Sequence, residues 1–183
     1  MPHRAWGTAL TPDPARRPHP GEQGRWIETD ALAREAVRLG QSALGAGHDV
    51  TRGALLASAW LKVKSGNAHA DTLARAVVMA LDGSTHAASA RNLLVTALRK
   101  NGQYEEAERV ARETLVMREE QLGPEYPHTL LLRSDLALTL YAAGRTTEAL
   151  ALAEENLAAG ERALGPHAPC TARLRKAHET IAA

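Results

Sequence analysis

Hydrophobic residues recur at helical spacing along most of the chain. Between residues 146 and 164, Ala149, Leu152, Ala153 and Leu157 follow one another at intervals that place them on one face of an α-helix. The same reading predicts four further helices, over about 50–65, 87–100, 129–143 and 171–183. Thr129 is expected at an N-cap, where its hydroxyl can accept an amide hydrogen, and Gly144 at a left-handed C-cap.

Composition removes the competing fold classes. The chain holds 36 Ala and 25 Leu but only 8 Val, 2 Ile and no Phe. Strands are enriched in β-branched and aromatic residues, and the chain has too few of them to form a sheet. We therefore expect an all-α fold in which Ala-rich helices pack closely together.

A repeat of 42 residues organises the second half of the chain. Residues 122–124 read Leu-Gly-Pro, as do residues 164–166, and a second proline follows each triplet at 127 and 169. The repeat predicts a solenoid over 28–183 that follows a disordered Pro/Arg-rich arm at 1–27. The expected parts of the solenoid are a partial repeat (28–50), a short degenerate repeat (51–86), two full repeats (87–128 and 129–170) and a capping helix (171–183).

A family resemblance rests on the motif of the first full repeat. Residues 102–107 read Gly-Gln-Tyr-Glu-Glu-Ala, and Leu115, Arg118-Glu119 and the run Leu-Gly-Pro-Glu-Tyr-Pro-His-Thr at 122–129 follow. This pattern closely resembles the tetratricopeptide repeat, in the 42-residue form of kinesin light chains and many bacterial repeat proteins. The resemblance implies a right-handed α-α superhelix of about three helix pairs with a C-terminal capping helix. It also implies a concave groove, lined by the first helix of each pair, that binds peptides.

Charge is balanced overall but unevenly placed. The chain has 22 Lys and Arg against 21 Asp and Glu. The predicted first helices carry only two acids, Asp135 and Glu179, whereas acids outnumber bases in the second helices. Ten bases lie in the first helices: Arg52, Lys62, Lys64, Arg91, Arg99, Lys100, Arg133, Arg173, Arg175 and Lys176. We therefore expect a basic inner layer and an acidic outer layer.

The resemblance also implies which residues would face a partner. The groove positions that it assigns are Trp60, Lys64, Asn92, Thr96, Arg99, Lys100, Ser134, Tyr141, Arg173 and Lys176. This set contains no acid, which favours a partner peptide with acidic residues or a free C-terminal carboxylate. The expected function is a non-catalytic protein-interaction module. Three alternatives stay open: a binder of nucleic acid or another anionic ligand through the same bases, solubilising cations that bind nothing specific, and self-association.

Catalytic and membrane functions have little support in the sequence. The chain has no phosphate-binding Gly-x-x-x-x-Gly-Lys-Ser/Thr loop and no Gly-x-Ser-x-Gly elbow. His86, His128 and Cys170 are one repeat apart, too far to share a zinc ion. We expect no enzyme activity, cofactor or metal. The chain has no long apolar run and a single cysteine, so we expect a cytoplasmic protein that does not cross a membrane. Nucleic acid is not the expected partner, because the chain lacks a global basic excess.

Overall fold

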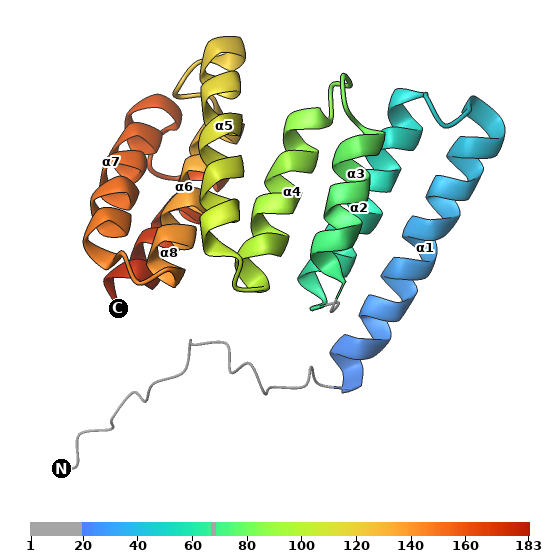
Figure 1. Ribbon diagram of the computed structural model, residues 1–183, viewed down its shortest axis with the longest axis horizontal. Helices are drawn as coiled ribbons and strands as arrows, with labels where there is room; N and C mark the ends of the chain where they lie inside the picture. Colours follow the sequence, from blue (N-terminus) through green and yellow to red (C-terminus); the bar gives the residue numbers. More distant parts are fainter. Residues whose placement is uncertain (1–19, 67–68) are drawn as a thin grey trace.

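The computed structural model of the chain describes residues 20–66 and 69–183, with side chains from residue 28 onward. Within these residues the chain forms eight α-helices and no strand (Figure 1). They are α1 (Pro20–Leu44), α2 (Asp49–Lys64), α3 (Ala70–Ala80), α4 (Ala87–Lys100), α5 (Tyr104–Leu122), α6 (Pro127–Ala142), α7 (Thr146–Leu164) and α8 (Pro169–Ala182). The all-α class that composition predicted and the repeat superhelix that the resemblance implied are both confirmed.

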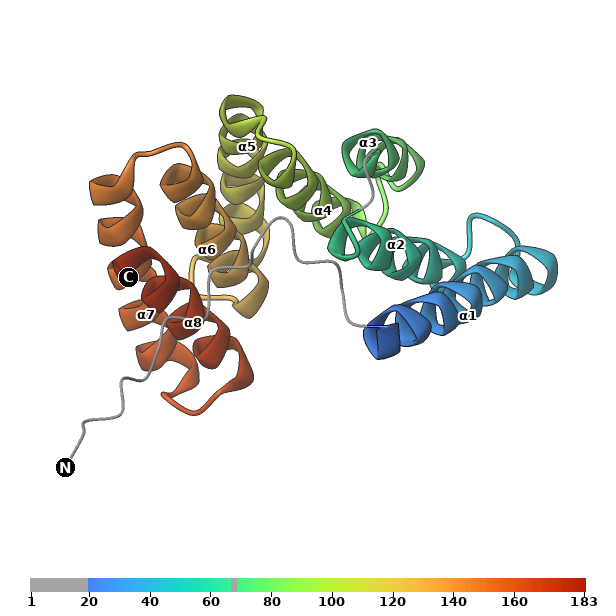
Figure 2. The ribbon, with the colours of Figure 1, turned by 90° about the horizontal axis from the view of Figure 1, so that it is seen from below.

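The helices are arranged in two layers. The even-numbered helices contact one another in series, α2 with α4, α4 with α6 and α6 with α8. In the part of the chain that the structure describes, the backbone of each odd-numbered helix packs only against the even-numbered helices next to it in sequence, and long side chains bridge successive odd-numbered helices. Figure 2 shows α2, α4, α6 and α8 along the inner side of an arc, with α3, α5 and α7 outside it. We call these even-numbered helices the inner layer.

Two predicted boundaries need correction. Helix α1 begins at Pro20 rather than near residue 28, so the last eight residues of the expected arm, 20–27, are helical, and residues 1–19 lie outside the described part. Thr129 is not an N-cap. Tyr126 has the extended backbone of a cap and Pro127 opens α6, where a missing amide hydrogen costs nothing. Thr129 instead lies fully buried in the first turn.

Leucines separated by small residues form the core. Leu81, Leu93, Leu98 and Leu140 are fully or almost fully buried in a cluster that extends from α2 to α8, with buried alanines between them. A second, smaller cluster joins α6, α7 and α8 around Leu130, Ala159 and Leu174. The burial of one such leucine stabilises the fold by about 2 kcal/mol. The abundance of Ala in the sequence thus reflects close packing of helix against helix.

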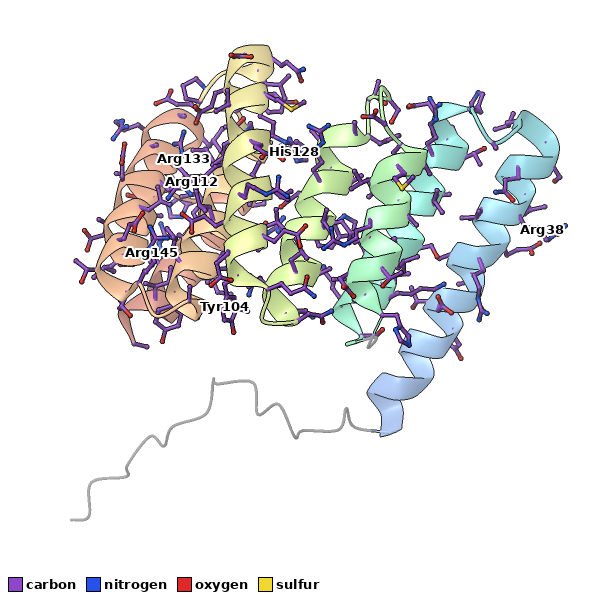
Figure 3. All side chains as sticks on the ribbon, viewed as in Figure 1. Arg38, Tyr104, Arg112, His128, Arg133 and Arg145 are labelled. Atoms are coloured by element: carbon purple, nitrogen blue, oxygen red, sulfur yellow. The ribbon has the colours of Figure 1, made fainter. Side chains whose placement is uncertain are left out.

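Ion pairs tie successive outer helices together. Arg75 of α3 forms a two-point contact with Glu106 of α5, at 2.8 and 2.6 Å. Arg145, just before α7, contacts Glu108 of α5 at 2.6 Å, and Arg112 of α5 also reaches α7. Figure 3 shows Arg112 and Arg145 on the same side of the molecule, over α5 and α7. These side chains are partly or fully exposed, so water and salt screen each pair and its contribution to stability is small.

Candidate partner-binding surface

One series of inner-layer arginines is engaged within the fold. These three residues are 42 positions apart in sequence, and each lies near an acid of the preceding outer helix or of the turn after it. The pairs are Arg91–Asp82 at 3.8 Å, Arg133–Glu119 at 2.6 Å and Arg175–Glu161 at 2.7 Å. Because their charge is already partnered, these arginines contribute little to binding an external anion.

A second group of inner-layer bases has no such partner. No ion pair joins Lys64, Arg99, Arg173 or Lys176 to a carboxylate of the residues that the structure describes. Lys64, Arg173 and Lys176 are exposed, whereas Arg99 is half-buried and its Nε has no hydrogen-bond partner. The Lys64 ammonium lies 5.9 Å from the ring centroid of Trp60, within reach of a weak cation–π contact. We call the surface that carries these four bases and Trp60 the inner face.

An acid lies among these bases, contrary to the expectation of an acid-free set. Asp135 of α6 accepts a hydrogen bond from the Asn92 side chain of α4 and lies in the field of Arg99 and Arg173. Burial raises the pKa of the Asp135 carboxyl above its ordinary value, because desolvation outweighs the opposing effects of the two arginines and of the hydrogen bond. The arrangement brings α4, α6 and α8 together around one carboxyl group. The centre of the inner face is therefore less basic than the sequence suggested.

Three of the predicted groove residues have roles inside the fold. Lys100 donates hydrogen bonds from Nζ to the carbonyl oxygens of Val63 and Lys64, at 3.0 and 3.3 Å, and so caps the C-terminal end of α2. Burial lowers the pKa of the Lys100 ammonium. Thr96 and Ser134 are each only 7% exposed, and the Thr96 hydroxyl donates to the backbone oxygen of Asn92. These three side chains offer little to a partner.

Five of the remaining predicted residues fall into two groups on the inner layer. Asn92, Arg99 and Arg173 all act on the Asp135 carboxyl, the first by a hydrogen bond and the two arginines by their charge, whereas Trp60 and Lys64 form their own contact on α2. Trp60 is partly buried against the core, and Tyr141 at the end of α6 is 37% exposed. Three of the ten predicted side chains thus influence one carboxyl group, and the others lie elsewhere along the same layer.

Sequence reasoning missed Asp135 and two residues near the amino end of α6, Arg118 and His128. Asp135 is one of the two acids of the predicted first helices and follows the predicted Ser134 directly, so the sequence could have drawn attention to it. Arg118 is 4% exposed, which is unusual for arginine. The sequence could have pointed to Arg118 through a difference between the two repeats. The residue at the same place in the next repeat, Gly160, has no side chain.

The described residues support neither a metal site nor a membrane-spanning helix. They contain no group of three or more His, Cys, Asp or Glu side chains that could hold a metal ion. None of their helices is long and apolar enough to cross a membrane.

Comparison with known proteins identifies the repeat. The profile of the tetratricopeptide repeat family matches residues 86–155. The fold is similar to the crystal structure of a Podosopora anserina protein assigned as a kinesin light chain with nearly identical TPR-like repeats. The TM-score is 0.64 at 20% identity, over 87% of this chain and 79% of that one. A single-substitution variant of that protein gives a TM-score of 0.65 at 20% identity, over 87% and 78%. No curated protein matches the chain in sequence.

Proposed function

Because the chain is a tetratricopeptide-repeat protein whose repeats are like those of kinesin light chains, we propose that it binds an acidic peptide segment of a partner protein along its inner face. Repeats of this family generally mediate contacts between proteins. We propose in addition that the partner segment is acidic. A protein that acts in this way is a non-catalytic adaptor or regulatory subunit.

The unequal pairing of the inner-layer bases carries this proposal. Arg91, Arg133 and Arg175 are held by the protein's own acids, whereas Arg99 and Lys176 are joined to no carboxylate by an ion pair within the described residues. A cation without a partner on a protein surface attracts an oppositely charged ligand and orients it. Asp135 restrains two of the arginines and repels a carboxylate at the centre of the inner face. The acidic residues of a bound peptide should therefore lie to either side of Asp135.

The experiment uses an array of ten-residue peptides of graded acidic content, followed by fluorescence anisotropy with the best binder. We expect Asp and Glu to be enriched among binders, and replacement of these residues by Asn and Gln to abolish binding. A protein variant with Arg99→Gln and Lys176→Gln should bind the same peptide at least tenfold more weakly. Lys100 is left unchanged because it caps α2.

The matched control removes the same charge from the outer layer. Arg109→Gln with Arg112→Gln deletes two exposed arginines of α5, which pair only with acids of α5 and α7 among the described residues. We expect this variant to bind the peptide like the wild type. Equal losses in the two variants would show a general charge effect and would contradict the inner-face assignment.

Salt dependence tests the alternative of a nucleic-acid ligand. A short acidic peptide makes few ionic contacts, so its affinity should fall gently as salt increases. A nucleic acid neutralised by several bases would give a steep linear fall of log affinity with log salt. Tighter binding of a labelled oligonucleotide than of any acidic peptide, with such a slope, would overturn the proposal.

A further inference from the structure

Arg118 occupies a place where the next repeat has no side chain. It precedes Thr129 by the same number of residues as Gly160 precedes Thr171. A Cβ atom at Gly160 would lie 2.5 Å from the Cδ1 atom of Leu174, so α7 and α8 leave no room for a side chain there. The α5–α6 pair accommodates a whole arginine at this position, and this is a local departure from the repeat.

The Arg118 guanidinium is buried without a countercharge. Its Nη2 donates a long hydrogen bond, 3.5 Å, to the hydroxyl of Ser89 on α4, and its Nε has no hydrogen-bond partner. No carboxylate of the described residues forms an ion pair with it, and the phenol of Tyr126, which affects its titration, is uncharged at neutral pH. Burial lowers the pKa of the guanidinium, yet arginine stays charged at neutral pH. Buried charges in proteins are normally paired, because desolvation costs several kcal/mol.

The neighbours of Arg118 are also positive or neutral. The exposed ring of His128 lies at the start of α6, and its pKa is lowered by burial and by the positive charges of Arg118 and Arg173. Ser89 and His128 lie in the first turns of α4 and α6, and Arg173 is the fifth residue of α8. The amino ends of helices carry partial positive charge and favour anions. The guanidinium groups of Arg118 and Arg173 and the amino ends of α4, α6 and α8 therefore all contribute positive potential at the end of the inner layer where these helices begin.

We propose that Arg118, His128 and Arg173 form a binding site for an oxyanion, the carboxylate or phosphate group of a peptide that lies along the inner face. Arg118 supplies a fixed guanidinium whose buried Nε–H has no acceptor among the described residues, and such a group makes charge-assisted hydrogen bonds to oxyanions. Arg173 supplies a second charge from α8, and the His128 ring donates one hydrogen bond in either of its neutral tautomers and two when protonated. The peptide part of this inference rests on the proposed function, whereas the anion site itself can be tested without a peptide.

The first experiment follows the His128 ring by NMR during addition of sodium phosphate and, separately, sodium acetate, with sodium chloride at equal ionic strength as the reference. His128→Asn assigns the ring signal. We expect phosphate or acetate to shift this signal in a saturable way and to raise the pKa of His128, because a bound anion favours the imidazolium form. A response no larger than that to chloride, or no response, would overturn the site.

Variants separate this site from general surface charge. Arg118→Gly installs the residue found at the equivalent place in the next repeat, and it should weaken phosphate binding at least tenfold. Arg173→Gln changes an exposed residue and should weaken it as well, which covers the case that Arg118→Gly unfolds α5. Arg109→Gln on the outer layer should have no effect. Equal phosphate affinities in all folded variants would overturn the proposal.

Peptides then identify the source of the oxyanion. Three versions of the best-binding peptide are compared, ending in a free carboxylate, a C-terminal amide or a phosphoserine amide. We expect the form with a free C-terminal carboxylate or the phosphoserine form to lose at least tenfold in affinity in Arg118→Gly, while the form with a C-terminal amide, which keeps only its side-chain carboxylates, is unaffected. If Arg99→Gln with Lys176→Gln weakens every form but Arg118→Gly weakens none, the proposed function stands and the anion site falls. If Arg118→Gly weakens phosphate binding but Arg99→Gln with Lys176→Gln weakens the binding of no peptide, the anion site stands and the proposed function falls.

Discussion

The contact between α7 and α8 allows a sharp test of how the repeat packs. Gly160 lies inside α7, and a Cβ there would approach Leu174 Cδ1 to 2.5 Å, far less than the roughly 3.5–4.0 Å of a normal carbon contact. Leu174 is only 2% exposed, so its methyl group cannot simply turn into solvent. Gly160→Ala should gain about 0.5–1 kcal/mol from helix propensity. Overpacking costs about 1–3 kcal/mol, so the net effect should be a loss of about 1 kcal/mol.

A second glycine provides the matched control. Gly53 also lies inside a helix, α2, but a Cβ there would meet only the His86 ring at 3.5 Å, an ordinary contact. Gly53→Ala should therefore stabilise the protein by about 0.5–1 kcal/mol. The free energy of unfolding of each variant is measured by urea denaturation followed by circular dichroism. Hydrogen exchange of α8 shows whether the loss in Gly160→Ala is local to the terminal helix pair.

A double-mutant cycle identifies the contact responsible. Leu174→Ala alone should cost about 2–5 kcal/mol, because it leaves a cavity in the small core cluster. Combined with Gly160→Ala, it should cost less than the sum of the single variants, since the new methyl group enters the space left by the leucine. If Gly160→Ala stabilised the protein as Gly53→Ala does, this result would contradict the close packing of α7 against α8 at Gly160 and Leu174.

Three further predictions concern charged side chains. Lys100→Met should lower the free energy of unfolding by about 1 kcal/mol, because the carbonyl groups at the end of α2 lose their donor; unchanged stability in urea denaturation would contradict this role. Glu106→Gln should cost at most about 1 kcal/mol, and the loss should shrink in high salt, since the pair with Arg75 is partly exposed. Asp135 has a raised pKa in the folded protein, so its ionisation opposes folding, and its contribution becomes less favourable as pH rises through that pKa. The free energy of unfolding of Asp135→Asn should therefore exceed that of the wild type at neutral pH, and the difference should disappear in acid. A difference between the two proteins that does not change with pH would refute the raised pKa of Asp135.

Several parts of the fold could be predicted because their causes are local. The bounds of α4 and α7 agree with the sequence, since apolar spacing and the turns at Gly102 and Gly144 act within a few residues. Thr129 shows the limit of this reasoning. A threonine before an apolar run has the chemistry of an N-cap, but here Pro127 starts the helix earlier and the threonine is buried against the neighbouring helix.

The candidate site was less predictable because it depends on which charges meet. Arg133 and Arg173 are both arginines of predicted first helices, at different positions of the repeat, and the sequence does not show which of the two meets an acid. Packing places Arg133 2.6 Å from Glu119 of the preceding helix, whereas Arg173 faces Asp135 and His128 of α6. Lys100 likewise looks like a groove residue in sequence and is a helix cap in the structure.

The sequence by itself determined the helical class, the 42-residue period and the excess of bases in one layer. These properties follow from residue type and from spacing over one or two helical turns. Only the tertiary structure decided which of those bases remain available to a partner, that an acid lies among them, and that Arg118 is buried without a countercharge. The physical reason is that the electrostatic state of a side chain depends on residues that packing brings within a few ångströms, and most of these lie on another helix, distant in the sequence.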